Sequence, residues 1–101
     1  MKPDNYLYNS KGEYIAFKSG RYVFNSKNEW IGWLPWNNNE IVNREGDYIG
    51  TLINDRLFSF SRRELKEHPG FIAFPGHPGF ISDPGFGGCT SLPPFAKDVD
   101  L

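Results

Sequence analysis

The chain has 101 residues, a formal net charge of −1, 17% aromatic residues, 11 Gly, 8 Pro and one Cys. This length predicts one domain, residues 1–101, and the near-neutral charge argues against a protein that binds a phosphate backbone such as nucleic acid. A single Cys cannot form an internal disulfide, no apolar run is long enough for a transmembrane helix, and residues 1–5 lack a signal-peptide core, so we expect a cytoplasmic protein.

Three segments of the first sixty residues repeat one pattern without gaps. Each reads apolar, Asn, two polar residues, Gly or Asn, acid, aromatic, Ile and a small residue. Such self-similarity indicates three copies of one supersecondary unit. The three segments are 8–16, 24–32 and 42–50.

The chemistry of the repeat predicts a hairpin with a bulged turn. An Asn at the first turn position can accept a hydrogen bond from the backbone two residues later. The residues three positions on, Gly12, Asn28 and Gly46, are types that tolerate a left-handed backbone. This spacing is typical of a type I turn followed by a G1 bulge.

Alternation of apolar and polar residues around these turns predicts an antiparallel meander. Tight turns are expected at Ser19-Gly20 and Asn54-Asp55, and a looser connection over 35–39. The expected strands are 6–8, 13–18, 21–24, 29–34, 40–42, 47–53 and 56–60.

The last third of the chain has a different organisation. A capping box at Ser61–Glu64 predicts a short helix over 61–67, which Pro69 ends. Residues 68–86 repeat the aromatic-Ile-small triplet after His-Pro-Gly turns. The segment 87–101 has no periodicity and is expected to be a loose tail.

These features predict an all-β fold, a quasi-symmetric shallow barrel or flower of antiparallel hairpins. An isolated hairpin is marginal in water, so the copies must bury their apolar faces against each other. The small residue in each copy would let neighbouring strands or aromatics approach closely, and radial arrangement would limit exposed edges. A flat solenoid is the competing arrangement, but it normally keeps a stricter period.

The repeats over 6–60, with the paired His-Pro-Gly-Phe-Ile motif that follows, resemble the four-fold β-flower family of small bacterial proteins. The resemblance covers roughly residues 6–86 and departs from the family pattern where Asn28 stands in place of Gly. It implies hairpin petals around a hydrophobic channel. A more distant likeness to the lipid-binding Tubby-type barrels implies membrane lipid as a ligand.

Our leading hypothesis is a non-catalytic binding module that accepts an apolar ligand or a lipid at the central channel or its mouth, without a cofactor. Trp36, in an Asn-rich loop, is the best candidate for an exposed aromatic side chain. The candidate ligand-binding residues are Tyr14, Ile15, Trp30, Ile31, Trp36, Tyr48, Ile49, Phe71 and Ile72.

Two other functions remain open on the sequence. One is a protein-interaction or homo-oligomer assembly module that uses Trp36 and strand edges. The other is a small metal- or Cys-dependent hydrolase built on His68, His77, Asp83 and Cys89, whose spacing matches none of the short paired zinc patterns.

The acids at equivalent repeat positions also admit two interpretations. Glu13, Glu29 and Asp47 could form a ring of carboxylates around a cation. The favoured interpretation is that each acid starts a strand at a turn and faces water, because clustered like charges repel.

Overall fold

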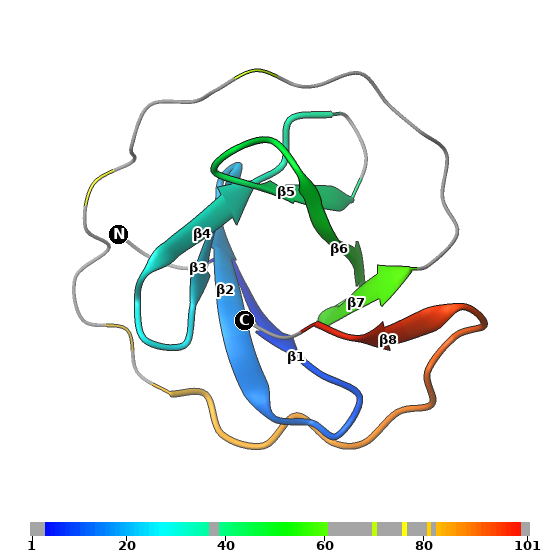
Figure 1. The fold of residues 1–101 in the computed structure, drawn as a ribbon. Helices are drawn as coiled ribbons and strands as arrows, with labels where there is room; N and C mark the ends of the chain where they lie inside the picture. The colour runs from blue at the N-terminus through cyan, green and yellow to red at the C-terminus, as the bar shows by residue number, and fades with distance from the viewer. Residues whose placement is uncertain are drawn as a thin grey trace.

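The computed structural model describes residues 4–36, 39–60, 70, 76, 81 and 83–99 (Figure 1). Every regular element within these residues is a β-strand. The helix expected over 61–67 and most of the Pro-Gly segment lie outside the described residues. Across the described ranges, no helix is long and apolar enough to cross a membrane. The strands are β1 (Asn5–Tyr8), β2 (Tyr14–Ser19), β3 (Tyr22–Asn25), β4 (Trp30–Trp33), β5 (Glu40–Asn43), β6 (Tyr48–Ile53), β7 (Arg56–Phe60) and β8 (Ala96–Asp98).

The strands form a closed, shallow barrel. Each strand from β1 to β8 pairs antiparallel with the next, and β1 also pairs with β7 in parallel at Tyr8 and Arg56. This contact closes β1–β7 into a ring, and β8 adds to β7 (Figure 1). The principal extents are 36 × 35 × 20 Å. The all-β barrel predicted from the sequence is confirmed.

The bulged turns are also confirmed. The residues at the third position after each Asn have positive φ angles of 83°, 66° and 96° at Gly12, Asn28 and Gly46. In each turn the Asn side-chain oxygen accepts two backbone N–H groups, as at Asn9, which accepts from Lys11 and Glu13 at 3.0 Å. The pairing registers shift at the same places, next to Tyr8, Phe24 and Val42.

At the other ends of the strands, one of the two tight turns differs from the prediction by one residue. Asn54-Asp55 joins β6 to β7 as expected. The turn between β2 and β3 is Gly20-Arg21, because Ser19 still pairs with Tyr22. Gly20 has a φ of 61°, which places the residue that tolerates the left-handed backbone at the first position of the two-residue turn.

Two apolar clusters lie on opposite sides of the barrel wall. The inner core contains Leu7, Val23, Ile41 and Leu57, which are all fully buried. The outer aromatic cluster has Phe17, Phe24 and Trp30 at its centre, with Phe17 and Phe24 stacked at 5.0 Å between ring centroids. Tyr6, Tyr14, Tyr22 and Ile81 pack against the outer cluster.

The tail completes a fourth copy of the repeat, and the prediction that it is loose is wrong. Phe58 of β7 pairs with Asp98 of β8, as Tyr8 pairs with Tyr14 in the first copy. Val99 follows Asp98 as Ile15 follows Tyr14, and it packs against the inner core. The sequence shows no periodicity here because residues 61–95 separate the two strands of this copy.

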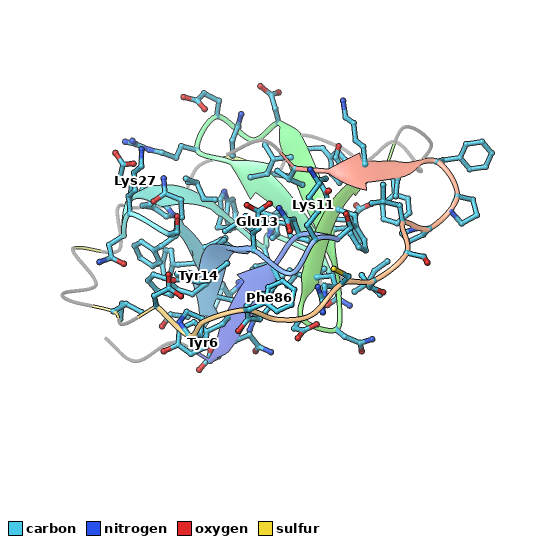
Figure 2. All side chains as sticks on the ribbon, turned by 90° about the horizontal axis from the view of Figure 1, so that it is seen from below. Tyr6, Lys11, Glu13, Tyr14, Lys27 and Phe86 are labelled. Atoms are coloured by element: carbon cyan, nitrogen blue, oxygen red, sulfur yellow. The ribbon has the colours of Figure 1, made fainter. Side chains whose placement is uncertain are left out.

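Residues 83–95, which we call the strap, run outside the barrel past β1 and β2 to β8 (Figures 1 and 2). Arg56 holds the strap: its guanidinium donates hydrogen bonds to the carbonyl oxygens of Gly87 and Gly88, both at 2.6 Å, and to Asn9 at 2.9 Å. The Gly87 amide donates to the Gly12 carbonyl at 2.8 Å. These contacts fasten the strap to the first hairpin turn.

The small residue of each copy permits close approach between neighbouring strands. A Cβ atom at Gly32 would overlap the carbonyl oxygen of Val42 on β5. One at Gly50 would lie 2.9 Å from Leu57 Cδ1 and 3.0 Å from Val99 Cγ2. The first conflict is with backbone, which cannot swing aside as a side chain can.

We therefore expect Gly32→Ala to lower the free energy of unfolding by about 2–4 kcal/mol, through overpacking against the β5 backbone. The reverse change in the first copy, Ala16→Gly, should cost only about 1 kcal/mol from added chain flexibility and lost packing. Urea denaturation followed by fluorescence measures both. Equal losses for the two variants would contradict a steric role for Gly32.

Candidate functional site

The Ile residues of the repeat converge, as the radial arrangement requires. Ile15, Ile31 and Ile49 are half-buried and all pack against the inner core. Val99 joins them as the equivalent residue of the fourth copy. The sequence analysis missed Val99, although its place one residue after β8 corresponds to that of Ile15 in β2.

The aromatic residues predicted to bind ligand do not join this group. Trp30 belongs to the outer aromatic cluster, and Tyr14 packs against the same cluster. The Tyr48 hydroxyl lies 2.7 Å from the Thr51 hydroxyl and accepts a hydrogen bond from the Phe60 amide at 3.1 Å. Of the predicted ligand-binding residues, the Ile side chains therefore pack on the inner core, whereas these aromatic side chains do not.

The remaining candidates lie away from the Ile group or outside the described residues. Phe71 and Ile72 are outside the described residues. Trp36 is half-buried rather than exposed, and it lies at the end of the barrel opposite the bulged turns. The expectation of an exposed Trp36 is therefore wrong.

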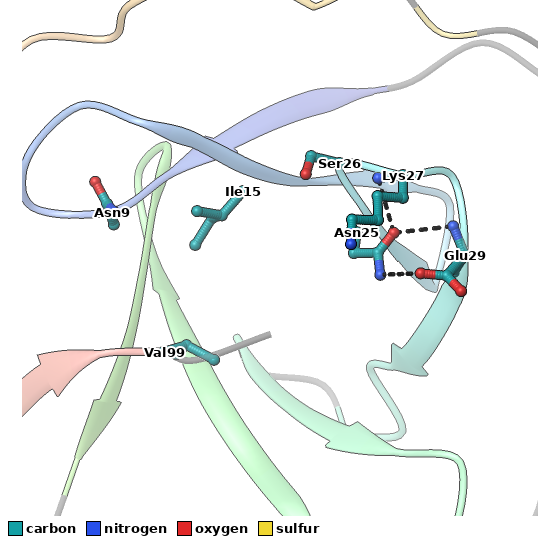
Figure 3. Close-up of a pocket in the computed structure, with 7 residues that line it drawn as sticks. All are labelled: Asn9, Ile15, Asn25, Ser26, Lys27, Glu29 and Val99. Carbon is teal, nitrogen blue, oxygen red and sulfur yellow. Dashed lines mark hydrogen bonds between the residues drawn. The ribbon is translucent and has the colours of Figure 1, made fainter.

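The centre of the barrel is packed, and a hollow remains at its mouth. Fully buried Leu7, Val23, Ile41 and Leu57 occupy the inner core. Beside the bulged turns lies a cavity of about 360 Å³, which we call the mouth pocket (Figure 3). The residues that line it are Asn9, Ile15, Asn25, Ser26, Lys27, Glu29 and Val99.

The two bulged turns at Asn9 and Asn25, strand β2 and the residue after β8 build the mouth pocket. Ile15 of β2 and Val99 after β8 contribute its two aliphatic side chains (Figure 3). The second bulged turn supplies one wall, and the Ser26 amide donates to the Ile15 carbonyl at 3.0 Å, which ties this wall to β2. The half-buried side chains of Ile15 and Val99 are thereby bordered by the polar groups of the second bulged turn.

Hydrogen bonds hold the polar rim of the pocket in place. The Asn25 side-chain oxygen accepts from the Lys27 amide at 2.9 Å and from the Glu29 amide at 3.0 Å. The Asn25 side-chain amide donates to Glu29 Oε1 at 3.0 Å (Figure 3). Because Asn25 and Glu29 bind each other, their side chains are oriented before any ligand arrives.

The acids of the repeat face water beside their turns, as the favoured interpretation of the sequence predicts. Glu13, Glu29 and Asp47 are all exposed at the starts of strands. Glu13 accepts from the Asn9 side-chain amide at 3.0 Å, as Glu29 does from Asn25. The carboxylates of Glu13 and Glu29 thus brace their own turns.

The candidate metal and cysteine residues are only partly described. His68 and His77 lie outside the described residues, while Asp83 and Cys89 are exposed on the strap. The Cys89 thiol lies 3.6 Å from the carbonyl oxygen of Lys11. Over the described ranges, no group of three or more His, Cys, Asp or Glu residues could hold a metal ion.

Tyr14 is the most strongly perturbed acid or base among the described residues for which a pKa shift is resolved. Burial raises the pKa of its phenol to about 12, and nearby Tyr6, Asp83 and Tyr8 add to the shift. Its hydroxyl oxygen is buried and has no hydrogen-bond partner among the residues that the structure describes. Deprotonation would therefore place an unpaired phenolate against the outer aromatic cluster.

This shift predicts alkaline destabilisation that depends on Tyr14. The folded protein holds the phenolic proton more tightly than the unfolded chain, whose pKa is near 10, so the stability contributed by neutral Tyr14 is complete below pH 10 and falls as the pH rises to about 12. Tyr14→Phe should flatten the stability profile between those values, and remove an unpartnered buried hydroxyl at neutral pH. Denaturation midpoints from pH 8 to 12 measure the effect; identical slopes for the two proteins would contradict it.

Comparison with known proteins adds no relative from which a role could be transferred. No family model matches the chain, and neither the curated proteins nor the solved structures include a significant match.

Proposed function

We propose that the protein is a non-catalytic binding module that takes a small amphipathic ligand, such as a single-chain lipid, in the mouth pocket. The observation that carries the proposal is the apolar pair Ile15 and Val99 beneath a fixed polar rim. An aliphatic group would lie on these two side chains. The polar group of the ligand would face Lys27 and Ser26.

The size and composition of the pocket support this ligand class. Its volume of about 360 Å³ lies at the lower end of the range usual for small-molecule sites. Half-buried Ile15 and Val99 would lose further contact with water when an apolar group covers them. Lys27 is exposed, so its ammonium can reach an anionic or zwitterionic headgroup.

A role as a binding module agrees with how the rim residues are used. The Asn25 side-chain amide and the Glu29 carboxylate are hydrogen-bonded to each other, which suits a rigid border better than a group that must exchange protons.

We also propose that the chain is a four-fold β-flower protein, which the four equivalent strand pairs support. Its exposed free thiol, Cys89, suits a reducing compartment such as the cytoplasm.

The proposal predicts that decanoate and decanol, each titrated below its micelle concentration or solubility limit, shift the amide NMR signals of Ile15, Ser26 and Val99 in a saturable way. Ile15→Ser should weaken binding by about tenfold or more, because it removes most of the apolar contact. Val99→Thr keeps the branched outline of the side chain but replaces a methyl group by a hydroxyl, so it lowers apolar contact with little change in shape.

The matched control is Ile53→Ser, at an exposed Ile that ends β6 beside the tight turn to β7. It should bind like the parent protein. Saturable shifts that persist in Ile15→Ser and Val99→Thr, or no saturable shift in the parent, would contradict the proposal. Circular dichroism spectra establish that each variant is folded.

A second function, protein interaction or self-assembly, is favoured by a different observation. Three large apolar side chains of the strap are exposed: Phe86 at 73%, Phe95 at 56% and Leu92 at 44%. Exposed apolar side chains that form a contiguous patch are typical of contact surfaces. Sedimentation equilibrium distinguishes the two functions, since assembly predicts a mass that rises with protein concentration and falls in Phe86→Ser.

A further inference from the structure

The barrel has a second hollow at the end opposite the bulged turns. It is an open hollow of about 510 Å³, and we call it the opposite pocket. It lies between the tight turn at Gly20-Arg21 and the connection that follows β4. Its lining includes two cations, Lys18 and Arg21, together with the apolar surfaces of Leu34, Pro35 and Trp36.

Lys18 breaks the internal symmetry of the barrel. It lies two residues after the small residue of its copy, as Leu34 and Leu52 do in theirs. Those two leucines are 7% and 8% exposed and belong to the inner core. The Lys18 side chain is only 25% exposed, so a charged group occupies a position that the second and third copies fill with a core leucine. Partial burial of a charge costs stability, and such departures are typical of functional sites.

Arg21 is held rigidly beside this lysine. Its Nε donates to the Leu34 carbonyl oxygen at 3.1 Å and its Nη2 donates to the Pro35 carbonyl at 2.8 Å. The guanidinium carbon also lies 5.8 Å from the centroid of the Trp33 ring. A guanidinium has five N–H donors, so this arrangement fixes the plane of the group with donors to spare.

A carboxylate of the chain already lies at the edge of the pocket. Asp4 accepts a hydrogen bond from the Gly20 amide at 2.6 Å and lies 3.8 Å from Lys18 Nζ. This second distance is too long for a hydrogen bond, so Asp4 balances charge without occupying the ammonium donors. Two cations and one carboxylate leave one positive charge unbalanced among these three side chains.

We propose that the opposite pocket binds a small organic monocarboxylate. The carboxylate would accept hydrogen bonds from Lys18 and Arg21, whose planar fork matches its geometry. The apolar body of the ligand would lie against Trp36 and Pro35. One unbalanced charge favours a monoanion over a phosphate, which carries more charge. This site is independent of the mouth pocket, so either proposal can fail without the other.

The test uses benzoate with benzamide, its neutral counterpart of nearly the same shape. Binding is followed by the amide NMR signals of Gly20, Arg21 and Trp36 in the full chain. We expect a saturable response to benzoate below about 10 mM and at least a tenfold weaker response to benzamide. Acetate should bind more weakly than benzoate, because it lacks the apolar body.

Lys18→Leu is the decisive variant, because it restores the residue type that the second and third copies have and is expected to fold at least as well as the parent. It should weaken benzoate binding by at least about tenfold. The matched control, Lys97→Leu, removes the same charge from an exposed site on β8 and should leave binding unchanged. An absent response to benzoate, an equal response to benzamide, or unchanged affinity in Lys18→Leu would each overturn the proposal.

Discussion

The convergence of one aliphatic side chain from each copy of the repeat is the constraint on which the barrel depends. Ile15, Ile31, Ile49 and Val99 all pack against one inner core. A single hairpin has too little apolar surface to be stable in water, so each copy needs the others. Close approach at Gly32 and Gly50 brings the strands near enough for these side chains to meet. Closure of the ring then follows from packing, with only one parallel residue pair between β1 and β7.

The same repeat gives the wall an outer side that is also apolar. The aromatic residue of the first two copies, Tyr14 and Trp30, turns outward to the outer aromatic cluster. Ile81 packs against that cluster, and Arg56 fastens the strap beside it. Along β2, Tyr14 and Phe17 pack in the outer aromatic cluster, whereas the adjacent Ile15 and Ala16 pack in the inner core, so one short motif supplies both clusters. The two pockets therefore lie at the ends of the barrel, where the strands turn.

Much of the fold could be predicted because its signals are local. Each Asn-to-Gly or Asn-to-Asn spacing specifies its turn through contacts within five residues, so Gly12, Asn28 and Gly46 were identified correctly. Strand β8 could not be found in this way. Its partner β7 lies far away in the sequence, and Asp98 replaces the aromatic residue that marks the other copies. A long-range pairing without the motif leaves no local signal.

The candidate site was predicted less well, for a related reason. Alternation separates neighbouring residues, so the triplet could place either its aromatic or its Ile on the inner side. In the structure, Ile15, Ile31 and Ile49 pack on the inner core, whereas Tyr14 and Trp30 pack in the outer aromatic cluster. Lys18 stands out only when it is compared with Leu34 and Leu52 at the same position of the next two copies. All three residues follow the ends of the repeated segments, so the repeat pattern did not include them.

The most direct test of the account is the unfolding free energy of Val99→Asp, measured by urea denaturation beside Leu92→Asp. Val99 is assigned to the fourth copy of the repeat and packs on the inner core, whereas Leu92 is exposed on the strap. We predict that the charge at residue 99 removes at least about 2 kcal/mol, while the same change at residue 92 stays within about 0.5 kcal/mol of the parent. Equal stability of the two variants would contradict a fourth copy of the repeat that the tail completes.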